Sequence, residues 1–204
     1  EMGVVSYDFG KTITCGEGGM LFTNDKKLDK YARDYHDHGH ELNPNFPRGE
    51  DTVKIIGFNY RMTEMQAIIG KEQLKKLDKI IRENKKRYKK LEKKIRNIAT
   101  FREEPIKGEQ IYDTLILFMK NKKKRNKIVN FLKTKGFGTK NLPDAIKWHC
   151  ASFWKHALPS KQIKRIKKTK NLLESSIAIP IWLRKSVADY DKLGTQLHTI
   201  ISTK

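Results

Sequence analysis

The chain is organised around Ser6-Tyr7-Asp8-Phe9-Gly10-Lys11, which is followed by the glycine-rich turn Gly16-Glu17-Gly18-Gly19. The apolar runs Val4–Tyr7 and Met20–Thr23 on either side predict two short buried strands. A lysine held among apolar residues loses the solvation of its charge, and its neutral amine can form a Schiff base with a carbonyl cofactor. The segment therefore predicts either a reactive lysine at a strand end or a tight hairpin turn without chemistry.

The order of lysine and glycines excludes a phosphate-binding P-loop. In a P-loop the lysine follows the glycines and lies on the helix that the loop opens. Here Lys11 precedes the glycines and a predicted strand follows them. Spacing alone leaves the hairpin and the reactive lysine as equal alternatives, because Gly-x-Gly-Gly is common in turns.

Further motifs follow in order along the chain. The chain resembles the DegT/StrS sugar aminotransferases in its opening segment and at Arg33–Gly39, Gly57–Met62 and Gln73–Leu77. These aminotransferases are fold-type-I enzymes that use pyridoxal phosphate (PLP). The resemblance covers most of the chain and implies an α/β fold that is the C-terminal part of a fold-type-I PLP transferase. In that reading, residues 1–78 are the C-terminal remnant of the large PLP-binding domain, and residues 79–204 are a linking helix and the small α/β domain.

The resemblance implies roles for individual residues. Lys11 would hold the cofactor and carry the proton, Ser6 would bind the cofactor phosphate, and Asn59 would bind the phosphate of the partner subunit's cofactor. On spacing alone, a turn residue is the better explanation of Asn59. Arg61 is either structural or a ligand for a substrate carboxylate, which its planar guanidinium suits. His149 is either a structural histidine or a substrate contact.

The implied function is PLP-dependent transamination of a keto-sugar, of the nucleotide-sugar or octulosonate type, for cell-surface polysaccharide (lipopolysaccharide) biosynthesis. Glutamate is the expected amino donor. The octulosonate type is suggested because Asp37–Glu41, Lys140–Ala145 and Ile179–Lys185 are similar to family members that act on such sugars. A site shared between subunits implies a homodimer.

Two rival functions keep the same fold. Since almost nothing of the large domain precedes Ser6, we expect residues 1–204 alone not to be a competent enzyme, and a truncated non-catalytic relative is one alternative. Dehydratases of this fold typically have histidine at the lysine position, so Lys11 speaks against that activity.

Charge suggests a different alternative, a basic nucleic-acid-binding module. The net charge is +21, with 44 basic and 23 acidic residues, and lysines cluster at residues 85–94, 120–127 and 161–170. These clusters are dispersed and are not interleaved with the aromatic residues that single-strand binders use for stacking. We therefore do not expect a nucleic-acid partner.

Targeting signals and membrane spans are not visible in the sequence. The longest apolar runs, such as Ile177–Leu183, are far shorter than a bilayer span, so no membrane partner is expected. The chain has no recognisable secretion signal at its start. Cys15 and Cys150 have no metal-type spacing, so free thiols in the cytoplasm are the default expectation.

A metal site at His36 and His40 is not expected. The two histidines are four residues apart, as zinc ligands on a helix can be, but Gly39 is placed to end the helix between them.

The remaining patterns predict regular elements and a long irregular loop, Leu42–Gly57. Trp148, Phe153 and Trp154 are expected in the core. Helices are predicted at Asp25–His36, Thr63–Ile95, Lys123–Lys135, Lys161–Ser175 and Ser186–Ile201, and later strands at Tyr112–Met119 and Ile177–Pro180.

Overall fold

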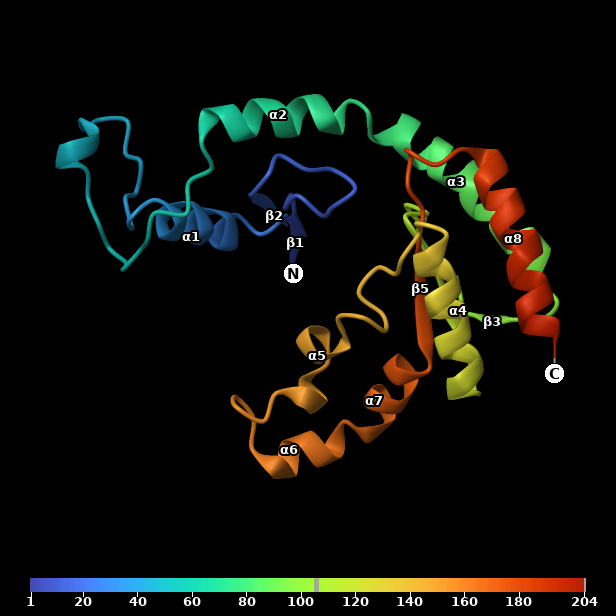
Figure 1. Ribbon diagram of the computed structural model, residues 1–204. Helices are drawn as coiled ribbons and strands as arrows, with labels where there is room; N and C mark the ends of the chain where they lie inside the picture. Colours follow the sequence, from blue (N-terminus) through green and yellow to red (C-terminus); the bar gives the residue numbers. More distant parts are fainter. Residues whose placement is uncertain (105–106, 204) are drawn as a thin grey trace. The chain divides into compact units, whose positions relative to one another are not determined.

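The computed structural model describes residues 1–104 and 107–203 (Figure 1). By its internal contacts the chain divides into two compact units, Glu1–Leu77 and Asp78–Lys204. Helices and strands are mixed in both units, as an α/β fold requires. Within the described ranges, no helix is long and apolar enough to cross a membrane.

The first unit begins with an antiparallel hairpin. Val4 of β1 lies opposite Leu21 of β2, and Ser6 lies opposite Gly19. The predicted strands and first helix are confirmed, and Asp25 caps that helix by accepting from the backbone N–H of Lys27 at 2.8 Å. The elements of this unit are β1 (Met2–Ser6), β2 (Gly19–Thr23), α1 (Lys26–His36), the 3₁₀ turn η1 (Arg48–Glu50) and α2 (Glu64–Leu74).

The predicted burial of the two strands is wrong, and the helix α2 of the same unit is largely exposed as well. Every residue of β1 is exposed, and α2 buries only Gly70 while Met65 is 76% exposed. A two-stranded ribbon has no further strands to close a core, and the described residues of the unit supply no layer that covers these side chains.

Two predicted helices are each divided in the structure. Residues 63–95 form α2 and α3 (Leu77–Ile95), and residues 160–174 form α6 (Ser160–Arg165) and α7 (Lys167–Glu174). The breaks lie at Lys75-Lys76 and Ile166, which have no strong helix-breaking tendency, so local propensity could not reveal them. The predicted start is confirmed, because Thr63 and Gln66 form a complete capping box.

The second unit is built on a three-stranded antiparallel sheet in the order β3-β4-β5. The free edge of β5 is partly covered, because Lys140 N donates to Ala178 O at 2.8 Å and Ala178 N donates to Leu142 O at 3.0 Å. The predicted strands and helices of this unit are confirmed, apart from the division at Ile166. The remaining elements are β3 (Thr100–Phe101), β4 (Thr114–Phe118), α4 (Lys122–Thr134), α5 (Ile146–His149), the 3₁₀ turn η2 (Ala151–Phe153), β5 (Ser176–Pro180) and α8 (Val187–Ser202).

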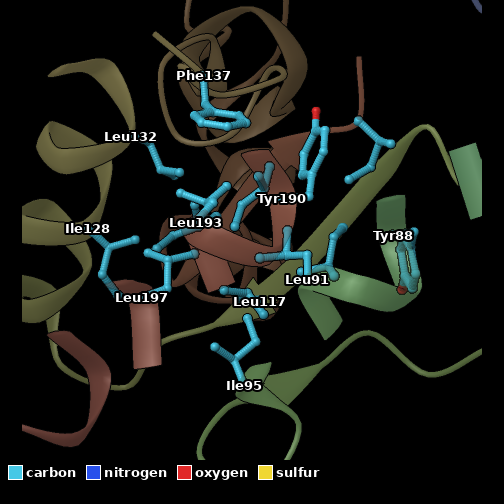
Figure 2. Close-up of a cluster of buried hydrophobic side chains, with 14 of the residues drawn as sticks. Tyr88, Leu91, Ile95, Leu117, Ile128, Leu132, Phe137, Tyr190, Leu193 and Leu197 are labelled. Atoms are coloured by element: carbon cyan, nitrogen blue, oxygen red, sulfur yellow. The ribbon is translucent and has the colours of Figure 1, made fainter. Parts of the chain in front are cut away.

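Three helices and two strands contribute to one core in this unit (Figure 2). Every second residue of β4 is buried, Leu117 among them, and all five residues of β5 are buried. Helix α8 comes close to α3 at Gly194, where an added Cβ would lie 2.8 Å from Lys94 Cβ. The fully buried side chains at the centre include Leu91, Ile128, Leu132, Leu193 and Leu197.

Tyr190 connects α8 to the end of β5. Its hydroxyl donates to Pro180 O at 3.0 Å and accepts from Trp182 N at 2.7 Å, while its ring meets Phe137 edge-on at 5.3 Å. Desolvation of the fully buried phenol raises the pKa of Tyr190 to about 12.

The substitution Tyr190→Phe is expected to destabilise the second unit by about 1–3 kcal/mol near neutral pH, because two buried backbone groups lose their partner. The phenol ionises near pH 10 when unfolded and near pH 12 when folded, so its contribution is complete below pH 10 and is lost as the pH rises through 12. The unfolding free energies of wild type and Y190F should therefore converge over this range.

Urea unfolding followed by tryptophan fluorescence checks this, since all three tryptophans lie in the second unit. The exposed Tyr31→Phe serves as the control and should match the wild type. A constant difference between Y190F and wild type from pH 8 to 12 would contradict the assignment.

Candidate functional site

The loop that joins β1 to β2 is ordered by the carboxylate of Asp8. The backbone N–H of Gly10 donates to Asp8 Oδ1 at 2.6 Å, and that of Lys11 donates to Asp8 O at 3.1 Å. The backbone N–H of Asp8 in turn donates to Ser6 Oγ at 3.3 Å. The hydrogen bond from Gly10 is the main reason why the pKa of Asp8 is lowered.

The same carboxylate brings together two of the predicted site residues. Lys11 Nζ lies 3.6 Å from Asp8 Oδ2, and Ser6 Oγ donates to that oxygen at 3.4 Å. Asp8 was not assigned a role from the sequence, although a short acidic side chain two residues before a glycine is typical of such turns.

The surroundings of Lys11 differ from the prediction. Its side chain is 49% exposed, and the neighbouring Phe9 projects into solvent instead of covering it. Lys11 is thus not held among apolar residues, because the loop stands at the end of an uncovered hairpin. The structure combines features of the hairpin and of the reactive-lysine alternatives. The strands form a hairpin, and the lysine lies just beyond a strand end.

Glycines of the turn permit a close contact with a second segment. A Cβ on Gly18 would lie 2.5 Å from Met62 Cε, and a Cβ on Gly19 would lie 2.8 Å from Val5 O. Met62 closes the segment Gly57–Met62, so the stretch that contains Asn59 meets the Lys11 loop through this methionine.

Asn59 is fixed by Arg61. Its Oδ1 accepts from Arg61 Nε at 3.1 Å and from Arg61 N at 3.3 Å. Because the amide oxygen is occupied by these donors, the Nδ2 group is left as a donor for another acceptor. Within the described residues, no hydrogen bond or ion pair joins Asn59 to Ser6 or Lys11.

A buried carboxylate holds Arg61 in turn. Arg61 Nη1 lies 3.1 Å from Asp37 Oδ1, and Arg48 Nη2 reaches the same oxygen from the loop Leu42–Gly57. Asp37 is only 5% exposed. Two guanidinium groups around one carboxylate give Arg61 a structural contact, while its Nη2 is not part of these interactions. The sequence did not single out Asp37 or Arg48, because their pairing depends on the path of the loop.

The histidines are separated by the end of α1. Gly39 has φ of +86°, and its N–H donates to Asp34 O at 2.7 Å, so His36 is the last helical residue and His40 lies outside the helix. Within the described ranges, no group of three potential ligands is arranged to hold a metal ion.

His149 lies in the second unit, where it is the exposed last residue of α5. The expectation of core positions for its neighbours is wrong: Trp148 is 80% exposed and Trp154 is also exposed, whereas Phe153 is half-buried. Helix α5 has a single turn, which cannot bury one whole face.

The chemical groups at the first-unit site fit PLP. The primary amine of Lys11 can bind an aldehyde, and the Ser6 hydroxyl beside it can donate to a phosphate. The Nδ2 group of Asn59 is a second donor suited to a phosphate.

Comparisons with curated proteins give sequence similarity over part of the chain. GDP-perosamine synthase from Escherichia coli O157:H7 is 43% identical over 81 residues, which cover 40% of this chain and 21% of that protein. UDP-4-amino-4,6-dideoxy-N-acetyl-beta-L-altrosamine transaminase from Helicobacter pylori is 42% identical over 73 residues, or 36% of this chain and 18% of that protein.

Solved structures show the same fold over nearly the whole chain. The aminotransferase TlmJ from Streptoalloteichus hindustanus matches with a TM-score of 0.77 at 18% identity, covering 99% of this chain and 52% of TlmJ. Helicobacter pylori PseC, an aminotransferase involved in pseudoaminic acid biosynthesis, matches with a TM-score of 0.73 at 22% identity, covering 97% of this chain and 53% of PseC. The chain thus spans about half the length of these proteins.

A family model settles the membership of the chain. The model of the DegT/DnrJ/EryC1/StrS aminotransferase family matches residues 1–198. The alternative of a nucleic-acid-binding module is not favoured by these similarities. The chain belongs to the DegT/DnrJ/EryC1/StrS aminotransferase family.

Proposed function

We propose that this protein, at its full length, is a PLP-dependent aminotransferase that transfers an amino group from glutamate to a keto-sugar. The observation that carries the proposal is the Ser6–Asp8–Lys11 arrangement, in which an amine and a phosphate donor share one carboxylate in a chain of this family.

Each polar group of the loop has a distinct task in this proposal. When bound, PLP supplies the electron sink that makes the carbon–hydrogen bond beside the amine acidic. The Nζ of Lys11 holds the cofactor in the resting enzyme, and after release it carries the proton to and from the substrate carbon. The Ser6 hydroxyl donates to the cofactor phosphate, and Asp8 keeps Ser6 and Lys11 beside each other.

Asn59 is proposed to complete the phosphate site of the partner subunit in a homodimer. Its Nδ2 group is oriented for donation because Arg61 occupies the amide oxygen. Arg61 therefore positions Asn59, and its remaining Nη2 group is available for a substrate carboxylate. His149 is proposed as a substrate contact.

A keto-sugar of the nucleotide-sugar or octulosonate type is the proposed substrate, and its amino product would be used for lipopolysaccharide or another surface polysaccharide. The names of the two curated relatives favour a nucleotide sugar, whereas the sequence similarities at Lys140–Ala145 and Ile179–Lys185 favour an octulosonate. We propose that the enzyme works in the cytoplasm, where the free thiols of Cys15 and Cys150 stay reduced.

Subunit complementation tests the shared site. Full-length Lys11→Ala and Asn59→Ala variants should each lose activity with a keto-sugar and glutamate by at least about 100-fold, since positioning and proton transfer are worth this much or more. After mixing and subunit exchange, activity should return to about a quarter of wild type, because half of the dimers are mixed and each mixed dimer has one intact site.

Lys27→Ala removes an exposed lysine from α1 and should leave activity unchanged. Sizing by light scattering establishes that both inactive variants still form dimers. An active Lys11→Ala enzyme would overturn the proposed function, whereas a mixture of dimeric variants that stays inactive would overturn the shared site alone.

A further inference from the structure

The net positive charge of the chain is confined to its second unit. Residues 1–77 contain 11 basic and 12 acidic residues, whereas residues 78–204 contain 33 basic and 11 acidic residues. The two units therefore have net charges of −1 and +22, which account for the +21 of the chain. A general lysine bias in composition would act on both units alike, so the segregation calls for a local cause.

Within the second unit, the stretch of residues 145–173, between Asp144 and Glu174, is one of two long acid-free stretches, the other being residues 114–143. Residues 145–173 contain eight lysine or arginine residues and no carboxylate side chain. They fold as α5, η2, α6 and α7, which we call the basic lobe, and Figure 1 shows it on the side of β5 away from α8. The basic residues are Lys147, Lys155, Lys161, Lys164, Arg165, Lys167, Lys168 and Lys170.

Four of the five lysines on α6 and α7 have no carboxylate partner among the described residues, whereas four of the seven lysines on α3 have one. On α3, Lys86 pairs with Glu83 at 2.6 Å and Lys89 pairs with Glu92 at 3.0 Å. On α6 and α7, the exposed Lys161, Lys164, Lys167 and Lys168 have no carboxylate partner among the described residues. Their charges are thus not neutralised locally, and they are available to an external anionic surface.

Apolar side chains are exposed in the same lobe. Leu172 is 52% exposed on α7, and Trp154 is exposed after η2, with its Nε1 donating to Lys147 O at 3.2 Å. The lobe is held together, because η2 contacts α6 and Lys170 Nζ lies 5.5 Å from the centre of the Phe153 ring. Indoles and leucines flanked by lysines are the composition of segments that lie in the interface of an anionic membrane.

We propose that the basic lobe is a docking surface for an anionic phospholipid bilayer, on which the protein lies without spanning it. Lysine supplies seven of the eight basic residues, and its ammonium acts as a point charge that anionic headgroups attract, whereas specific nucleic-acid contacts favour the planar fork of arginine. Trp148 is left out of the surface, because it adjoins His149, the proposed substrate contact.

This inference reverses the expectation that the protein has no membrane partner. That expectation rested on span length, which bears on insertion across a bilayer and not on adsorption to its surface. The docking surface is independent of the proposed aminotransferase activity, and no residue of the Lys11 loop belongs to it.

Vesicle co-sedimentation of the full-length protein tests the proposal. The protein should bind vesicles of phosphatidylcholine containing about 30 mol% phosphatidylglycerol but not vesicles of phosphatidylcholine alone, and binding should weaken at least about tenfold when salt is raised to about 0.5 M. A variant with Lys161, Lys164, Lys167 and Lys168 all changed to glutamine should lose at least about tenfold in partition coefficient.

The matched control removes the same charge from elsewhere in the second unit, by changing the exposed Lys79, Lys90, Lys93 and Lys192 to glutamine. It should stay within about twofold of wild type, since binding requires the local patch. Leu172→Ser leaves the charge unchanged and should weaken binding about threefold or more, through the apolar surface it no longer buries.

Circular dichroism establishes that each variant is folded. The proposal is overturned if wild type does not bind the anionic vesicles, or if both quadruple variants lose binding equally. The proposal is also overturned by a second outcome, at a salt concentration at which wild type does not bind the vesicles. In that outcome the wild type binds a single-stranded oligonucleotide and the lobe variant loses this binding.

Discussion

The carboxylate of Asp8 is the contact on which the candidate site depends. It accepts the backbone N–H of Gly10 and meets both the Ser6 hydroxyl and the Lys11 amine. The antiparallel register of β1 and β2 sets the ends of this loop, and the absence of a side chain at Gly18 lets Met62 approach it. A two-stranded hairpin has little stability of its own. Local hydrogen bonds around Asp8 therefore decide which side chains face one another.

The two units differ in what stabilises them. The second unit closes a core between β4, β5 and three helices, and Tyr190 fastens the chain where it leaves the sheet. The first unit keeps apolar side chains of α2 and β1 in solvent, and its order depends more on polar contacts such as the buried Asp37 with its two arginines. The net charge follows the same division, because the excess of basic over acidic residues lies in the second unit, which has the larger core.

Much of the fold could be predicted from local patterns. The helix starts at Asp25 and Thr63 and the strand β4 depend on a few neighbouring residues, so the sequence predicted them. Tertiary contacts, which no short window of sequence contains, decide the helix breaks at Lys75-Lys76 and Ile166 and the exposure of α2. For the site, the resemblance pointed to Ser6, Lys11 and Asn59. The contacts of Asp8 and Asp37 could not be predicted, because they depend on the path of the loops. The roles of Ser6, Lys11, Asn59, Arg61 and His149 all remain predictions.

Reductive trapping measures the role of Lys11 most directly. The full-length protein is incubated with PLP and reduced with sodium borohydride, and the modified peptide is then identified by mass spectrometry. With more than thirty other lysines in the chain acting as internal controls, we predict one stoichiometric adduct, on Lys11 of Ser6–Lys11. A stoichiometric adduct on another lysine, with Lys11 unmodified, would contradict the assignment of this loop as the cofactor site.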